Sequence, residues 1–187
     1  MATIDDFLAD AQGRMDKSVV ATREHFNALR TGRASSALLD RVTIDYYGSP
    51  TPLKQLATIN APEARLLTVQ PFDPGSIKQI EKAILESDLG LNPSNDGKLI
   101  RLPIPQLTEE RRKEYAKMAR QMAEEGRVAV RNVRRDVMHH LQELVKNGDV
   151  GDDEERRAEE RVQKLTDEHV KQIDDLLKHK EAEIMEV

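Results

Sequence analysis

The sequence of 187 residues contains no cysteine and no tryptophan, and aromatic residues make up only 3 % of it. Without cysteine the chain can form neither a disulfide framework nor a thiolate zinc site, and it has no cysteine nucleophile. The scarcity of aromatic rings argues against stacking platforms for single-stranded nucleic acid. We therefore expect a core built mainly from Leu, Ile, Val, Met and Ala, as in long packed helices.

Long hydrophobic runs are missing from the sequence as well. No segment approaches the roughly 18 consecutive apolar residues that cross a bilayer. The N-terminal stretch "MATIDDFLAD" is acidic, whereas a signal peptide is basic and then apolar. These features predict a soluble cytoplasmic protein with no membrane partner.

Three long segments show apolar residues in steps of three and four, which is typical of amphipathic helices. We expect the first helix over about 4–30 and the second over 107–147. The third follows the glycine-containing segment "GDVGDDEE", and in it Val170, Leu177 and Ile184 lie seven residues apart. Three such stripes predict a long antiparallel three-helix bundle, made of residues 1–30 and 107–187.

Residues 31–106 hold all eight prolines of the chain and interrupt the predicted bundle. Alternating apolar and polar residues predict strands in "RVTIDYYG", "LATINAP", "RLLTVQPF" and "LIRLPIP". The segment "SIKQIEKAILES" is expected to form a helix, with Ser76 and Gln79 at the spacing of a capping box. One helix on a few strands predicts a small inserted domain, so the fold class is α+β.

Two segments, "RTGRASS" and "PIPQL", connect the bundle to the inserted domain. Gly32 in the first is conformationally free, and Pro103 and Pro105 in the second exclude helix. A double connection resists twisting but can still bend. We therefore expect hinges near residues 30–34 and 103–107.

Four arginines lie in the segment "RVAVRNVRRDV" (127–137), although the chain carries a formal net charge of -5. On a helical wheel with Arg127 at zero, Arg131, Arg134 and Arg135 fall near 40°, 340° and 80°. Val133 and the other core-type residues of this helix fall between roughly 240° and 300°. The wheel predicts that the valines face the bundle and that the arginines face outwards.

The outward stripe is expected to bind phosphate, because a planar guanidinium donates two hydrogen bonds to a phosphate group. Lys113, Lys117 and Arg120 extend the stripe along the helix, Glu124 interrupts it, and Asp136 falls near 180°, where it does not neutralise it. The alternative is a solvated helix surface laced with salt bridges. On these grounds nucleic-acid or other anion binding and a solvated surface both remain open.

Gly126 lies on the apolar face in the middle of the second helix. Glycine costs roughly 1 kcal/mol relative to alanine at such a position. We expect close packing of a neighbouring helix to compensate for this cost.

Metal and catalytic sites are not expected. The five histidines are either adjacent on one helix or scattered among charged neighbours, and zinc needs converging ligands. The acidic run 152–155 lacks the glycine and the alternating oxygen ligands of a calcium loop. No nucleophile, base and orienting group occur together, so we expect neither an enzyme nor a bound cofactor.

Six segments spread along nearly the whole chain have a familiar sequence and order. They are "LRTGRAS", "DYYGSPTPLKQLA", "SDLGLNPSNDG", "PQLTEERRKE", "VAVRNVRRD" and "HKEAEIMEV". Taken together, they resemble the bacterial ribosome recycling factor family.

This resemblance implies a monomeric, L-shaped and tRNA-like protein, whose inserted domain is a small α/β sandwich. Together with elongation factor G, the family disassembles the ribosome, mRNA and tRNA complex that remains after termination, and it is not itself an enzyme. By this resemblance the bundle would lie on large-subunit ribosomal RNA. The residues expected to bind that RNA are Arg127, Arg131, Arg134, Arg135, Arg30 and Arg33.

A different class of function is a helical protein-interaction adaptor. Such an adaptor would use a hydrophobic face or the acidic third helix, and its partner would tolerate removal of charge from the second helix.

Overall fold

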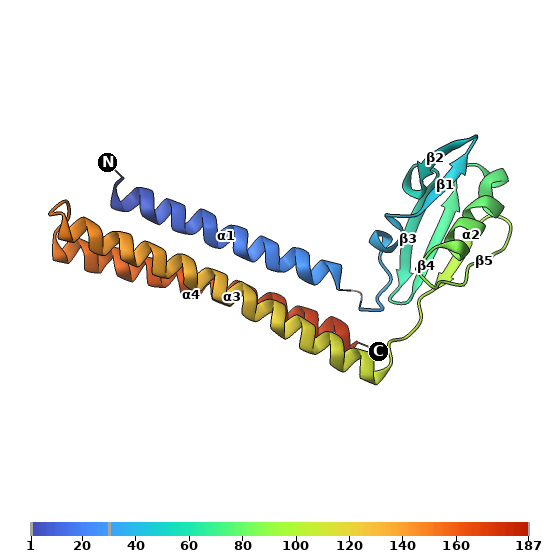
Figure 1. Ribbon diagram of the computed structural model, residues 1–187. Helices are drawn as coiled ribbons and strands as arrows, with labels where there is room; N and C mark the ends of the chain where they lie inside the picture. Colours follow the sequence, from blue (N-terminus) through green and yellow to red (C-terminus); the bar gives the residue numbers. More distant parts are fainter. Residues whose placement is uncertain (1, 30, 187) are drawn as a thin grey trace. The chain divides into compact units, whose positions relative to one another are not determined.

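The computed structural model describes residues 2–29 and 31–186, and they divide into two compact units (Figure 1). The first unit contains residues 2–29 and 109–186 and is entirely helical. The second contains residues 31–108 and combines a small antiparallel sheet, a hairpin and one α-helix. The fold is therefore α+β, as expected. No helix in the described part of the chain is long and apolar enough to cross a bilayer.

The first unit consists of α1 (Ile4–Ala28), α3 (Glu109–Lys146) and α4 (Asp152–Met185), which pack together along their lengths (Figure 1). α1 begins with a capping box, in which the Asp6 amide donates to the Thr3 hydroxyl at 3.2 Å and the Thr3 amide donates to the Asp6 carboxylate at 2.8 Å. These hydrogen bonds hold the pKa of Asp6 below its usual value. α1 ends two residues earlier than expected, and Leu29 caps it.

The bundle core contains many of the apolar residues that recur in steps of three and four along the three helices. Met15 of α1, Leu141 of α3 and Ile173 of α4 are each almost completely buried. Aliphatic burial of this kind stabilises the fold by roughly 25 cal/mol per Å² of apolar surface removed from water.

The buried face of α4 differs from the expected one. Ile184 is fully buried, but Val170 and Leu177 are only partly buried and lie at the margin of the core. The centre of the face contains Thr166, His169 and Lys180 instead, which is why a search for apolar residues alone misplaces it.

Each of these three polar side chains has its own hydrogen-bond partner. The Thr166 hydroxyl donates to the Val162 carbonyl at 2.8 Å, within α4. His169 Nε2 lies 2.6 Å from the Asp16 carboxylate of α1. Lys180 Nζ donates at 3.2 Å to the Leu29 carbonyl at the end of α1. A buried polar group is tolerated when it is hydrogen-bonded, and the last two pairs also tie α4 to α1.

The second unit contains a hairpin and a four-stranded antiparallel sheet with the order β3-β4-β6-β5. A single α-helix, α2 (Ile77–Glu86), covers them, and its apolar residues Ile80 and Ile84 are fully buried. The strands are β1 (Thr43–Tyr46), β2 (Ser49–Pro52), β3 (Ala57–Glu63), β4 (Leu66–Pro71), β5 (Ser94–Asn95) and β6 (Ile100–Pro103).

The capping box predicted at Ser76 is wrong. The Ser76 side chain makes no capping hydrogen bond to α2, and its hydroxyl donates at 2.7 Å to the Asp73 carbonyl. The chain enters α2 through a short 3-10 turn, Pro74–Ser76, and the Asp73 carboxylate caps that turn by accepting from the Gly75 amide at 3.0 Å. Because the turn comes first, the capping position moves three residues towards the N-terminus.

The two connecting segments differ in how much of each is held by the sheet of the second unit. Gly32 has a φ of +77°, and a Cβ there would lie 3.1 Å from the Leu107 side chain. Pro103 is the last residue of β6, opposite Leu66, and the Ile104 amide continues the pairing by donating to the Arg65 carbonyl at 2.8 Å. Pro103 is thus held in the sheet, and the irregular part of the second connection starts after it.

Candidate nucleic-acid interface

The apolar face of α3 fixes how the helix sits in the bundle. Val130 and Val137 are completely buried between α1 and α4. At Gly126 a Cβ would collide with the Thr22 hydroxyl of α1 and would lie 3.1 Å from Ile173 Cδ1 of α4. The close packing expected at Gly126 is therefore confirmed, and it shows which face of α3 lies against α1 and α4.

The four arginines of residues 127–137 do not all face outwards, which corrects the expectation from the wheel. Arg131 and Arg135 are exposed, but Arg127 and Arg134 are half-buried beside α4. On the wheel the two half-buried residues are the ones nearest to the apolar face. A neighbouring helix that packs on this face therefore reaches them first.

Arg127 is held by ion pairs within the bundle. Its Nε donates to Asp174 of α4 at 2.7 Å and its Nη1 donates to Glu124 at 2.8 Å, and only 19 % of its side chain is exposed. Burial alone would lower the pKa of Arg127, but the hydrogen bonds to Asp174 and Glu124 outweigh it and raise the pKa. Arg120 likewise donates to Glu181 of α4 at 2.7 Å. Acidic residues of α4 thus neutralise part of the predicted stripe.

Arg131, Arg134 and Arg135 form what we call the α3 arginine patch. Arg134 Nε donates to the neutral side chain of Gln163 at 2.7 Å, and Arg135 donates to the neutral side chain of Asn132. Neutral partners orient a guanidinium and leave its charge uncompensated. Such groups can donate bidentate, charge-assisted hydrogen bonds to phosphate.

Glu124 is the acidic neighbour of the patch. Its carboxylate accepts from Arg127 at 2.8 Å and from Arg131 at 3.2 Å. The hydrogen bond from Arg127, followed by the charge of Arg131, holds the pKa of Glu124 below its usual value, so the carboxylate is ionised at neutral pH. An anion that approached Arg131 would therefore compete with Glu124 for this side chain.

Asp136 lies on the opposite margin of α3, beside α1. It accepts from Arg14 at 2.8 Å, and this hydrogen bond holds the pKa of Asp136 below its usual value. Arg14 of α1 is therefore the main partner of this carboxylate, and the charge of Arg135 contributes a smaller attraction.

Arg30 and Arg33 are the remaining predicted RNA-binding residues. Arg30 lies outside the described residues. Arg33 is exposed in the second unit, whereas the patch belongs to the bundle. Among the described residues, no group of three or more His, Cys, Asp or Glu side chains could hold a metal ion.

The sequence matches known proteins over nearly its full length. Residues 22–185 match the family model described as ribosome recycling factor. The ribosome-recycling factor of Rubrobacter xylanophilus is 58 % identical over 180 residues, which is 96 % of this chain and 97 % of that protein. The ribosome-recycling factor of Synechocystis is 56 % identical, over 96 % of this chain and 99 % of that protein.

Two solved structures are similar to the whole chain. A solution structure of a ribosome recycling factor is 42 % identical with a TM-score of 0.75, and each chain is covered completely. A T. thermophilus ribosome recycling factor, described with E. coli elongation factor G bound to the E. coli post-termination complex, is 46 % identical. Its TM-score is 0.66, with 99 % of this chain and 100 % of that chain covered. This chain therefore belongs to the ribosome recycling factor family.

Proposed function

We propose that this chain, a non-enzymatic translation factor, acts with elongation factor G to disassemble the post-termination complex of ribosome, mRNA and tRNA. The observation that carries the proposal is the family match over residues 22–185. It is supported by the similar T. thermophilus factor, which is described with elongation factor G on a post-termination complex. Released ribosomes would then be available for another round of translation.

The α3 arginine patch is the proposed contact with large-subunit ribosomal RNA. Arg131, Arg134 and Arg135 lie within little more than one helical turn, so their guanidinium groups can reach neighbouring phosphates. Arg30 and Arg33, at the junction after α1, are proposed to add further contacts. Arg127 takes a different role in this proposal, because its ion pairs to Asp174 and Glu124 brace α3 against α4.

Bending of the two connections is the proposed mechanical element. Gly32 has a left-handed backbone conformation, and Pro105 lies in the irregular segment between β6 and α3. The bundle can then stay on the ribosomal RNA while elongation factor G displaces the second unit, with Pro103 as the fixed end of β6.

The function is tested by splitting of purified post-termination ribosomes, followed by light scattering. We expect subunits to separate when this chain, elongation factor G and GTP are all present, and not when any one is omitted. The Rubrobacter xylanophilus relative serves as the positive control. If that relative splits the complexes and this chain does not, the proposed function is wrong.

Replacing Glu124 with glutamine is expected to strengthen binding to the large subunit about two- to fivefold, because a partly exposed ion pair of about 0.3–1 kcal/mol no longer competes for Arg131. Equilibrium binding between 50 and 200 mM salt measures the effect. Glu125→Gln removes the same charge from the same helix and is the control, since Glu125 contacts Gln121 rather than an arginine. Equal affinities of the two variants would contradict the competition.

A further inference from the structure

The two edges of the β1–β2 hairpin differ in their ability to pair with another strand. The hairpin is a separate two-stranded sheet, in which β1 pairs with β2 and with no other strand of the described chain. Its turn, Tyr47 and Gly48, has positive φ at both positions, as a two-residue type I′ turn requires. An exposed strand edge carries unpaired amide and carbonyl groups and is a template for further pairing.

The register shows which backbone groups point out of the hairpin. Tyr46 pairs with Ser49 across the two-residue turn, and the Leu53 amide donates to the Val42 carbonyl at 3.0 Å. Hydrogen-bonded pairs alternate with non-hydrogen-bonded pairs in an antiparallel ladder. The amide and carbonyl groups of Thr43 and Asp45 therefore point away from β2.

Proline blocks one of these two edges. Opposite Thr43 and Asp45 stand Pro52 and Pro50, which have no amide hydrogen to offer on the outer side of β2. The outer side of β1 has no proline. The hairpin is thus closed to a further strand along β2 and open along β1.

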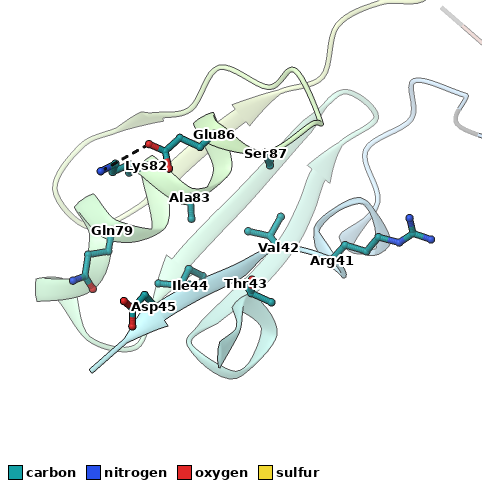
Figure 2. Close-up of a pocket in the computed structure, with 10 residues that line it drawn as sticks. All are labelled: Arg41, Val42, Thr43, Ile44, Asp45, Gln79, Lys82, Ala83, Glu86 and Ser87. Atoms are coloured by element: carbon teal, nitrogen blue, oxygen red, sulfur yellow. Dashed lines mark ion pairs between the residues drawn. The ribbon is translucent and has the colours of Figure 1, made fainter. Parts of the chain in front are cut away.

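A groove runs along the open edge of β1. Its volume is about 500 Å³, and it is lined by the consecutive residues 41–45 and by one side of α2, including Gln79, Lys82 and Glu86 (Figure 2). Consecutive strand residues point to alternate faces, so a hollow that all of them line follows the edge of the strand rather than one face.

The groove continues past the end of β1. A second hollow, of about 350 Å³, shares Asp45 and Gln79 with the first and extends to Tyr46, Tyr47 and Asp73. The strand itself, Thr43 to Tyr46, spans three residue steps, or about 10 Å of extended chain. We call the two hollows together the β1 groove.

Charge is distributed unevenly along the β1 groove. Arg41 lies at one end of the groove, and Asp45 and Asp73 lie at the other end. The rings of Tyr46 and Tyr47 also line that second end, with their centroids 4.6 Å apart in an edge-to-face arrangement. In the middle, Lys82 and Glu86 of α2 pair with each other at 3.8 Å. The ends thus favour an acidic side chain near Arg41 and a basic one near the carboxylates and aromatic rings.

We propose that the β1 groove binds an extended segment of a partner protein, which adds to β1 as an antiparallel strand. The segment carries a basic residue opposite Asp45 and an acidic residue four positions later, opposite Arg41. Hydrogen bonds from Thr43 and Asp45 hold its backbone, and apolar side chains between the charges lie next to Val42 and Ile44. This inference concerns the second unit alone and does not depend on ribosome binding.

The probe is an N-acetylated, C-amidated pentapeptide with the order lysine, valine, threonine, valine, glutamate. It is titrated into the ¹⁵N-labelled full-length protein, and amide shifts and hydrogen exchange are recorded. We expect the largest shifts along residues 41–47 and at least tenfold slower exchange of the Thr43 and Asp45 amides at saturation. The peptide with lysine and glutamate interchanged is expected to bind at least threefold more weakly.

Backbone methylation of the probe distinguishes strand addition from binding by side chains alone. Methylating the threonine nitrogen removes a hydrogen bond to β1 and is expected to weaken binding at least tenfold. Methylating the first valine nitrogen, which points away from β1 in this register, is the matched control and should change binding less than threefold.

Two protein variants complete the test. Thr43→Pro closes the β1 edge as Pro50 and Pro52 close β2, and it should abolish binding while the circular dichroism spectrum is unchanged. Asp45→Lys should reverse the preference between the two peptides, which keeps the proposal testable if Thr43→Pro does not fold.

Three results would overturn the proposal. They are absence of binding by either pentapeptide, equal binding of the two methylated peptides, and shifts confined to residues outside 41–47. Concentration-dependent shifts of the β1 amides without peptide would identify a second copy of this chain as the occupant instead.

Discussion

Replacing Gly126 with valine is expected to lower the free energy of unfolding by about 3 kcal/mol, which makes it one of the most damaging single substitutions in the bundle. The added Cβ would collide with the Thr22 hydroxyl, and it would lie 3.1 Å from Ile173 Cδ1. Both neighbours are buried, with 3 % of Thr22 and 0 % of Ile173 exposed. The new side chain can therefore be accommodated only if α1 or α4 moves away from α3.

Thr22 cannot easily turn aside. Its side chain is branched at Cβ, which restricts χ1, and its hydroxyl donates to the Ser18 carbonyl at 2.9 Å within α1. A rotation that relieves the contact with residue 126 also breaks this hydrogen bond. The clash can therefore be relieved only by moving the helix backbone. The free-energy cost of that movement exceeds the gain of at most roughly 1 kcal/mol from replacing glycine with a better helix former.

Urea unfolding of the full-length protein measures the effect, and Gly13 provides the matched control. Gly13 is an exposed glycine of α1 with no atom within 4 Å of an added Cβ, so Gly13→Ala should stabilise the protein by about 0.5–1 kcal/mol. Thr22→Ala, made together with Gly126→Ala, should recover part of the loss from Gly126→Ala alone. Normal stability of Gly126→Val would show that the three helices are less closely packed at this level.

The helices of the bundle could be predicted from the sequence because each is marked by a regular spacing of apolar residues within its own segment. Apolar residues at steps of three and four specify a buried face, and the interruption of that pattern at Gly126 could be explained by close packing alone. The centre of the α4 face could not be found in this way. His169 and Lys180 can be buried because of their partners, Asp16 in α1 and Leu29 at the C-terminal cap of α1.

The charged surface of α3 was predicted only in part, for a related reason. A wheel of one helix gives the angle of each arginine but not the residues of the helix beside it. The wheel therefore separated Asp136 from the arginines, but it could not show that Asp174 and Glu181 of α4 hold Arg127 and Arg120. The signal available in the sequence was the excess of acidic over basic residues in the third helix.

In the second unit, the four strands with alternating apolar residues were predicted, and β2 and β5 were missed. β2 contains two prolines and β5 has two residues, so neither shows the alternation that indicates a strand. Both are held by pairing with a neighbour, β1 for β2 and β6 for β5. Such pairing is set by turn geometry and register rather than by the strand's own composition.

Removing two arginines of the patch is expected to have the largest effect on ribosome binding. The double variant Arg131→Ala, Arg135→Ala should bind the large subunit about 100-fold more weakly, at about 1.5 kcal/mol for each lost charge-assisted contact with phosphate. The dependence of log affinity on log salt should also become shallower by about one to two units. Both side chains are exposed, so the free energy of unfolding should stay within about 0.5 kcal/mol of the original.

Arg127→Ala should lower the stability of the protein but have little effect on ribosome binding, because Arg127 already has two acidic partners inside the bundle. Only 19 % of its side chain is exposed, and its loss leaves Asp174 without that partner, so stability should fall while the salt dependence of binding changes little. Lys164→Ala with Lys178→Ala removes two exposed positive charges from α4 and controls for net charge. If the Arg127 variant loses as much affinity as the double variant at equal stability, the patch extends to Arg127. If the Lys164 and Lys178 control loses as much, binding depends on net charge rather than on the α3 surface.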